Sequence, residues 1–461
     1  MSDGYQNNLM TATNLVFSKM YPKVYTSRVK TRVSNALLIG EIIGQITIGL
    51  VCDIIGRKSA IVLTTSCLVF GGILATAAHG KTPEGMFWML TVMRGVQGFG
   101  VGGEYPASSV SASEAANETV KRRGGLFCLV TNLPLSLGGP FAISVFLIIW
   151  VAAGGPNNLN TIWRTAFGIG CVWPLAVFIF RWRLATTELY RKSAIGQDLW
   201  KISFLTIRFY WKRMIGTCGC WFLYDFITFP NGIFSATIIN GILKGEHKGD
   251  IKRTLEWQLL LGFLAIPGVF VGAFLCDRIG RKYTMALGFS GYIVFGLIIG
   301  CAFDKISKII PLFVVFYGLF NSFGNMGPGD MLGLISSECY STPVRGSLYG
   351  LSAAVGKAGA AIGTQVFLPI RNNLGDRWTF IIAAIIGLVG VLNTLIFVPH
   401  LRDEDLMSED MRFADYLRKN GYTGTFGING ETIEDQFDRT RSDSVPSIDK
   451  APEKTSIVEV N

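Results

Sequence analysis

The chain has 461 residues and a formal charge of +10; half of the residues are hydrophobic and only 16% are charged, against about a quarter in an ordinary soluble domain. A soluble protein of this charge would suggest nucleic-acid binding, but the sequence holds no nucleic-acid motif, and nearly every apolar run has the length of a membrane span, about 20 residues. The three histidines are scattered, no nucleophile lies beside a base, and the nine cysteines lack metal-binding spacing. We therefore expect neither an enzyme nor a nucleic-acid-binding protein, and no cofactor or metal.

Eleven apolar runs follow one another, and they predict an all-α membrane protein. They lie near residues 33–54, 59–79, 86–112, 124–153, 161–181, 213–240, 255–276, 283–303, 309–335, 347–370 and 378–398. Residues 3–20 form a weaker twelfth segment that is too polar to face lipid. This segment is either an inward-facing helix or the second half of a helix whose beginning is missing.

Composition changes along the chain predict four regions. Residues 1–181 and 213–398 form two six-helix halves, joined by a basic central loop over residues 182–212. The tail, residues 399–461, is rich in acidic and hydroxyl residues and is expected to be disordered. Because basic loops stay on the cytosolic side of a membrane, we expect the central loop and both termini to be cytosolic.

A repeated motif supports this division into halves. The pattern Cys-Asp-x-x-Gly-Arg-Lys occurs at residues 52–58 and again at residues 276–282, an offset of 224 residues. The same offset separates two glutamates at the ends of the fourth and tenth spans, and an arginine-glycine turn follows each of them. This is the parallel repeat of a secondary transporter.

The charged residues of the repeat predict a latch between the halves. An Asp accepts hydrogen bonds at the start of the next helix, a Gly permits the tight turn, and Glu and Arg pair across helices. Such a network can hold the cytosolic side closed and release it when the halves rock. The predicted latch residues are Asp53, Arg57, Glu114, Arg123, Asp277, Arg281, Glu338 and Arg345. The simpler alternative is that these charges only orient the helix ends.

These motifs resemble the major facilitator superfamily over residues 3 to about 400. The segment Arg94-Gly-Val-Gln97-Gly98 in the fourth span is similar to a second signature of that superfamily. The resemblance implies two six-helix halves related by a pseudo-two-fold axis and transport by alternating access. It adds Arg94 and Gln97 to the candidate functional residues.

Several spans contain charged residues, each of which costs about 2.5–3.5 kcal/mol at mid-membrane and is therefore a functional candidate. Trp221 and Asp225 share one helical face, and Lys357 lies among small residues, where it can meet an anion as a point charge. A carboxylate such as Asp225 can hold Lys357 when no anion is bound. For each charge the alternative is a pair that only fixes helix register. The charged candidates are Asp3, Glu41, Arg94, Glu104, Asp225, Asp330 and Lys357.

Three segments resemble the fungal phosphate:proton symporter family. They are Gly-Gly-Glu-Tyr-Pro at 102–106, Trp-Phe-Leu-Tyr-Asp at 221–225 and Ser-Ala-Ala-Val-Gly-Lys at 352–357. The resemblance implies contact with phosphate for Tyr105, Trp221, Asp225 and Lys357. It implies proton movement through Asp3, Glu104 and Asp225.

Some positions depart from the inorganic-phosphate members of that family. The acid before the tyrosine is Glu104 instead of Asp, and their fifth-span glutamine has no match near Asn132. Phe229 stands where they have an aromatic hydroxyl, and Gly329, followed by Asp330, stands where they have an asparagine. These changes predict a larger site with different polar contacts to the substrate.

The segment 221–234, Trp-Phe-Leu-Tyr-Asp-Phe-Ile-Thr-Phe-Pro-Asn-Gly-Ile-Phe, is similar to the fungal glycerophosphodiester permeases. The resemblance implies proton-coupled uptake of glycerophosphoinositol or glycerophosphocholine across the plasma membrane. The expected partners are a small phosphate-bearing anion, protons and membrane lipid. Two alternatives stay open: an inorganic phosphate:proton symporter, and a transport-dead sensor or truncated paralogue, which the position of Asp3 near the start of the chain suggests.

Overall fold

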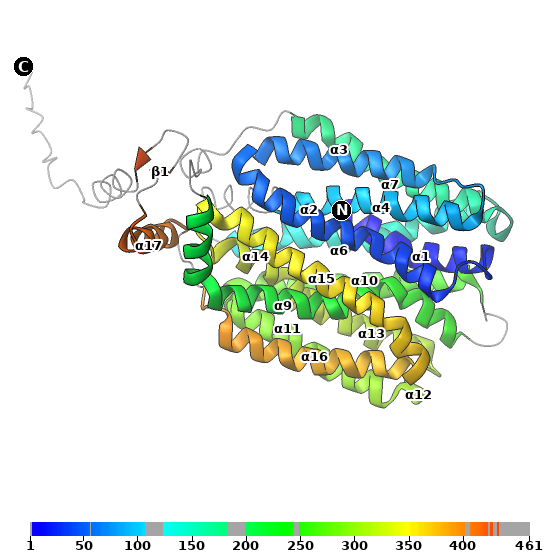
Figure 1. Ribbon diagram of the computed structural model, residues 1–461. Coiled ribbons are helices and arrows are strands. Elements are labelled where there is room, and N and C mark those ends of the chain that lie inside the picture. Colours follow the sequence, from blue (N-terminus) through cyan, green and yellow to red (C-terminus); the bar gives the residue numbers. More distant parts are fainter. Residues whose placement is uncertain are drawn as a thin grey trace, which may run out of the picture.

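The protein is a bundle of long helices (Figure 1). The computed structural model describes residues 2–55, 57–106, 123–182, 199–243, 249–401, 406–422, 425–426 and 431–432. Within them ten helices are long and apolar enough to cross a membrane. Large hydrophobic side chains cover their outward faces; Ile148, Phe204 and Ile396 are each 68% exposed. This surface is expected of helices that face lipid.

Within the described residues the N-terminal half has six long helices, and the first of them is the polar segment for which the sequence leaves two interpretations. This helix, α1, packs on α6 and α7 in the same half, and Tyr5, Gln6 and Leu9 are fully buried. The interpretation of α1 as an inward-facing helix agrees with this packing. The helices are α1 (Ser2–Met20), α2 (Ser27–Ile55), α3 (Arg57–Thr76), α4 (Pro83–Glu104), α6 (Arg123–Ala152) and α7 (Leu159–Trp182), with the short η2 (Gly155–Asn158) before α7.

The C-terminal half repeats the six-helix plan, but its fourth helix is broken. A turn of π-helix, η4, separates α13 from α14 at the Gly-Pro-Gly sequence of residues 327–329, where Pro328 cannot donate a backbone hydrogen bond. The elements are α9 (Leu199–Ile242), α10 (Ile251–Arg278), α11 (Arg281–Cys301), α12 (Phe303–Ile306), α13 (Ile310–Gly324), η4 (Asn325–Gly329), α14 (Asp330–Glu338), α15 (Thr342–Leu374) and α16 (Asp376–Phe397). Asp330 is consequently placed at the first position of α14.

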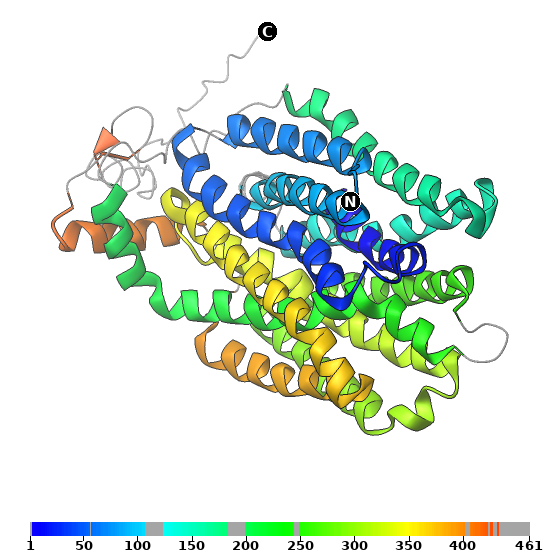
Figure 2. The same cartoon turned by 45° about the vertical axis from the view of Figure 1, so that its right-hand side comes forward.

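The two halves meet along two seams. In one seam α2 packs along α15, and in the other α6 packs along α10; the α2–α15 pair is visible in Figures 1 and 2. Small residues allow the close approach: a Cβ on Gly49 would lie 3.3 Å from the Cα of Gly350 across the first seam. The space between the seams is where polar side chains of both halves can meet.

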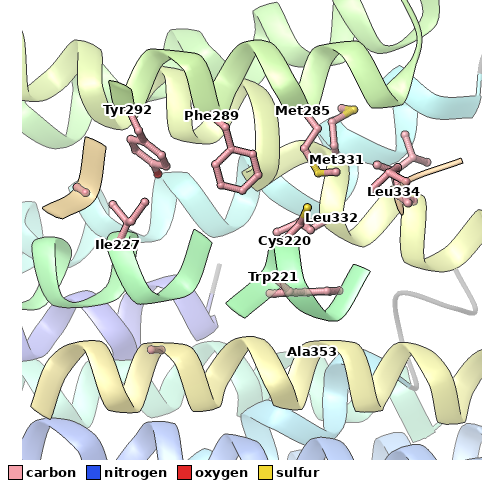
Figure 3. Packing of buried hydrophobic residues seen from close by; sticks show 14 of the residues in the cluster. Cys220, Trp221, Ile227, Met285, Phe289, Tyr292, Met331, Leu332, Leu334 and Ala353 are labelled. Carbon is pink, nitrogen blue, oxygen red and sulfur yellow. The ribbon is translucent and has the colours of Figure 1, made fainter. Parts of the chain in front are cut away.

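Hydrophobic packing fixes the helices that carry the polar residues. In the C-terminal half Trp221 lies between α9 and α15, and Met285, Phe289 and Tyr292 project from α11 towards α9 (Figure 3). A second cluster of buried residues holds α1 against α6 and α7 in the N-terminal half. This packing holds α9 against α15.

The described residues depart in part from two of the predicted regions. The polar loop expected over residues 182–212 is in part helical, because α9 begins at Leu199. The tail expected to be disordered over residues 399–461 contains the amphipathic helix α17 (Leu406–Lys419) and a two-stranded pairing of β1 (Thr425–Phe426) with β2 (Glu431–Thr432). In α17, Phe413 and Leu417 lie one turn apart and are buried. The helix therefore has an apolar face, although its overall composition is polar.

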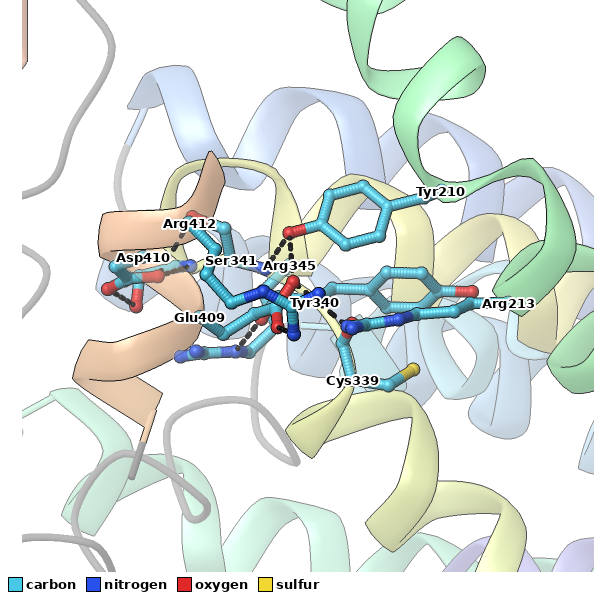
Figure 4. Close-up of polar contacts among 10 residues, drawn as sticks. Tyr210, Arg213, Cys339, Tyr340, Ser341, Arg345, Glu409, Asp410 and Arg412 are labelled. Carbon is cyan, nitrogen blue, oxygen red and sulfur yellow. Dashed lines mark hydrogen bonds and ion pairs between the residues drawn. The ribbon is translucent and has the colours of Figure 1, made fainter. Parts of the chain in front are cut away.

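The helix α17 is bonded to the ends of two transmembrane helices. Glu409 pairs with Arg213 of α9 at 2.9 Å and accepts a hydrogen bond from the Tyr210 hydroxyl at 3.0 Å. Asp410 accepts from the Thr342 backbone N–H at 2.7 Å, at the first residue of α15. It also accepts from the Ser341 hydroxyl at 2.8 Å (Figure 4). The tail helix thus joins the ends of α9 and α15, the helices that carry Asp225 and Lys357.

Candidate functional site

A cavity of about 540 Å³ lies between the two halves. Its volume is within the range of small-molecule sites, about 300–1,000 Å³. Helices α1, α4, α6, α9, α10 and α15 and the broken segment around η4 all contribute to its wall. The candidate residues that line it are Asp3, Glu104, Tyr105, Trp221, Asp225, Asp330 and Lys357. All the residues predicted to bind substrate or to couple protons therefore face one chamber.

Lys357 is held between two carboxylates. Its Nζ lies 3.2 Å from Oε2 of Glu41 and 3.7 Å from Oδ2 of Asp225. All three residues are at most 3% exposed. When all three groups are ionised, the cluster carries one excess negative charge in a place where charge is costly. One proton, or the movement of Lys357 to a different anion, changes this balance.

A hydrogen-bonded chain extends the cluster to α1. The Asn7 side-chain amide donates to Asp3 Oδ1 at 2.6 Å and to Glu41 Oε1 at 3.2 Å. The Tyr105 hydroxyl donates to Asp3 Oδ2 at 2.5 Å. Asp3 is therefore connected to Lys357 through Asn7 and Glu41, so the predicted proton-coupling carboxylates Asp3 and Asp225 belong to one network.

Aromatic rings surround the lysine. Its Nζ lies 3.8 Å from the ring centre of Phe229 and 5.5 Å from that of Tyr105. Both distances are within the range of a cation–π contact. Trp221 packs edge-on against Tyr349 at 5.5 Å, and a Cβ on Gly356 would collide with the Trp221 ring. Gly356 therefore permits the approach of α9 to α15 next to Lys357.

A second polar pair lies at the other seam. The Asn132 amide of α6 donates to Asp330 Oδ1 at 2.6 Å. Both residues are buried, and the bond joins the N-terminal half to the C-terminal half. Asp330 Oδ2 has no partner among the described residues and lies against Gly272, where a side chain would collide with it.

Three candidates have surroundings that differ from the others. Glu104 lines the cavity, but its Oε1 accepts from the Thr65 hydroxyl of α3 at 3.3 Å. Arg94 and Gln97 are buried in the N-terminal half, and neither is among the described residues that line the cavity. Arg94 instead lies 5.5 Å from the Phe167 ring of α7.

The C-terminal part of the predicted latch lies together at one end of the bundle. Arg281 Nε is 3.2 Å from Glu338, and Arg281 Nη1 is 3.7 Å from Asp277. Asp277 also accepts from the backbone N–H of Gly125 in α6 at 3.1 Å, so this cluster contacts the opposite half. Arg345 donates to the Tyr340 carbonyl at 3.1 Å. The side chains of Asp53, Arg57 and Arg123, and the whole of Glu114, lie outside the described residues.

Sequence reasoning assigned no role to four residues of the site. Glu41 is one of the charged candidates in the sequence, but its pairing with Lys357 depends on the α2–α15 seam, which no local pattern reveals. Asn7 follows Asp3 by one helical turn, a spacing that predicts their contact. Asn132 and Phe229 differ from the inorganic-phosphate symporters at their positions, but the sequence does not predict their contacts with Asp330 and Lys357.

The helical halves, the broken tenth span and the charged central chamber define a facilitator-type secondary transporter. The model of the sugar (and other) transporter family matches residues 2–194 and 185–413, and the chain belongs to this family.

Two yeast proteins resemble most of the chain. It is 58% identical over 446 residues to glycerophosphoinositol permease 1 of Candida albicans, covering 96% of this chain and 85% of that protein. It is 56% identical over 442 residues to glycerophosphoinositol transporter 1 of Saccharomyces cerevisiae, covering 95% and 84%.

A solved structure has the same fold. The proton:xylose symporter XylE bound to 6-bromo-6-deoxy-D-glucose superposes with a TM-score of 0.71 at 17% identity, covering 88% of this chain and 96% of XylE.

Proposed function

We propose that this protein is a glycerophosphodiester permease that takes up its substrate together with protons. The observation that carries the proposal is a buried lysine, Lys357, held by Glu41 and Asp225 in a chamber of about 540 Å³ between the halves. A phosphodiester is a monoanion that can replace a carboxylate as the partner of the lysine. The names and the high identity of the two yeast relatives support the choice of cargo.

The lysine changes partners during transport. Protonation of Glu41 or Asp225 weakens its hold on Lys357, and the ammonium group turns to the phosphate. Glu41 belongs to the N-terminal half and Lys357 to the C-terminal half, so their ion pair ties the halves together. Transfer of the lysine to substrate therefore releases one bond that opposes rocking of the halves.

Protons also remove an electrical penalty. A membrane potential of 100 mV, negative inside, opposes entry of one negative charge by about 2.3 kcal/mol. One proton carried with a phosphodiester makes the net transported charge zero, and a second makes entry favoured by the potential. Asp225 and the chain Asp3–Asn7–Glu41 offer carboxylates that can receive these protons.

The protein works in the plasma membrane with both termini in the cytosol. In this orientation the cluster of Asp277, Arg281 and Glu338 lies on the cytosolic side, next to Gly125 of the opposite half. It acts as a latch that opens when substrate is released inwards. The basic residues of segment 182–212 support this orientation.

Direct uptake tests the proposal. A yeast strain that lacks its own glycerophosphodiester and phosphate carriers would express the protein and receive labelled glycerophosphoinositol, glycerophosphocholine or inorganic phosphate. We expect accumulation of a glycerophosphodiester above the vector control. Accumulation of phosphate alone would favour the phosphate symporter, and no accumulation of any of the three by protein present at the cell surface would contradict transport.

A further inference from the structure

We propose that Asp330 and Asn132 form a second binding pole in the cavity, which recognises the hydroxyl groups of a polyol esterified to the phosphate. The inference rests on the proposed function and deepens it, because it names the class of alcohol that the permease selects. It assigns the inositol end of glycerophosphoinositol to this pole and the phosphate to Lys357.

The two poles belong to different seams between the halves. Lys357 projects from α15, which packs on α2, and Asp330 begins α14 beside α6 and α10. Asn132, the partner of Asp330, comes from α6. All three residues line the same cavity. A ligand that contacts both poles must therefore extend across the chamber, as a phosphodiester with a substituent does.

The chemistry of the second pole suits hydroxyl groups. A carboxylate accepts hydrogen bonds from hydroxyl groups. Asp330 is bonded to an amide, whereas the carboxylates of the other pole are paired with Lys357, so the phosphate is assigned to the lysine. Asp330 is 2% exposed, and only one of its two oxygens is bonded within the described part of the chain. Asp330 lines the cavity, so a ligand hydroxyl that joins or displaces the Asn132 amide can donate to its carboxylate. The Asn132 amide adds both a donor and an acceptor.

The neighbouring surface is also rich in hydrogen-bonding groups. Gly329 precedes Asp330, and a Cβ there would lie 2.9 Å from the Tyr224 hydroxyl and 3.3 Å from the Asn132 amide nitrogen. The glycine therefore lets the Tyr224 hydroxyl and the Asn132 amide approach the backbone beside Asp330. Asn321 and Asn325 line the cavity from the same broken helix. A trimethylammonium group has no N–H or O–H to offer such a surface, whereas inositol has several hydroxyls.

The test compares two substrates in Asp330→Ala. The KM for glycerophosphoinositol and for glycerophosphocholine is measured in the uptake strain, and their ratio does not depend on the amount of transporter. We expect the glycerophosphoinositol KM to rise at least about tenfold, the worth of a hydrogen bond to a charged group, and the glycerophosphocholine KM to change less than about threefold. Asn132→Ser should shift the ratio in the same direction.

Controls separate the possible failures. Ser66→Ala removes an exposed hydroxyl of α3 that donates to the Val62 carbonyl of the same helix, and should leave the ratio unchanged. An equal rise for both substrates in Asp330→Ala would overturn the polyol pole while leaving the proposed function intact. A selective loss of glycerophosphocholine uptake would overturn it in favour of a cation site.

If the unaltered protein transported neither diester, the proposed function itself would fail. If Asp330→Ala does not reach the membrane, Asp330→Asn and Asn132→Ser decide by the same ratio.

Discussion

At the scale of single residues, the cluster around Lys357 explains why carboxylates are buried in this bundle. Removing one member of a buried ion pair leaves an uncompensated charge and costs about 3–5 kcal/mol. Lys357 has two carboxylate partners, Glu41 and Asp225, so one of them can be protonated while the other remains paired. One carboxylate can therefore take up a proton while Lys357 keeps an ion pair with the other.

Substitution of Asp225 by Asn tests this role. Asn cannot carry a transported proton, so Asp225→Asn should abolish accumulation against a gradient, while exchange of labelled for unlabelled substrate persists because it needs no net proton movement. Uptake and counterflow in cells or vesicles measure the two activities. Glu256→Gln, in an exposed pair with Arg253, is the matched control and should accumulate normally. Full accumulation by Asp225→Asn would contradict its role.

Gly356 tests the position of the neighbouring tryptophan. In Gly356→Ala the added methyl group would collide with the Trp221 ring and push α9 from α15 beside Lys357. We expect the substrate KM to rise about tenfold or more, because a small misplacement of binding groups is costly. Gly168→Ala, where the nearest atom would be 3.6 Å away, should leave KM unchanged. Equal KM values in the two variants would show that this contact is dispensable.

At the scale of the helices, the sequence predicted most spans, because apolar runs of membrane length are uncommon outside membrane helices. It also identified the residues of the chamber on α4, α9 and α15. It could not predict the Glu41–Lys357 pair, because the pairing arises from contact between helices distant in sequence. It also failed at α17, because a hydropathy argument responds to mean polarity and not to one apolar face on a polar helix.

The tail helix should stabilise the bundle by capping α15. Asp410 accepts from the Thr342 backbone N–H and from the Ser341 hydroxyl at 2.8 Å, as an N-terminal cap supplied by a different helix. Asp410→Ala should cost about 1 kcal/mol and lower the unfolding midpoint in detergent by about 2 °C. The control Asp415→Ala breaks an exposed pair with Lys419 and should shift the midpoint much less. Equal midpoints for both variants would show that the cap contributes nothing.

At the scale of the whole molecule, the two halves provide the moving parts and the charged chamber provides the coupling. The Glu41–Lys357 and Asn132–Asp330 contacts join the halves at separate seams. Rocking that separates the halves at either seam would break or reorganise the contact there. Because one contact belongs to the phosphate pole and the other to the polyol pole, a substrate that engages both poles can influence both seams.

The coupling predicts the direction of the pH dependence. Protons enter on carboxylates of the cavity together with substrate, so a lower external proton concentration reduces the loaded fraction. We expect the initial uptake rate of glycerophosphoinositol to fall as external pH rises from about 5 to 8, at constant membrane potential. Residual exchange by Asp225→Asn should depend on pH less strongly. A rate that rises with pH in the unaltered protein would contradict proton symport.

Proton movement in purified protein tests the central claim most directly. Proteoliposomes containing the transporter and a pH-sensitive dye inside are exposed to glycerophosphoinositol, with potassium and valinomycin clamping the membrane potential. The account predicts acidification of the interior that requires substrate and is absent with Asp225→Asn. Substrate entry without any change of internal pH would contradict it.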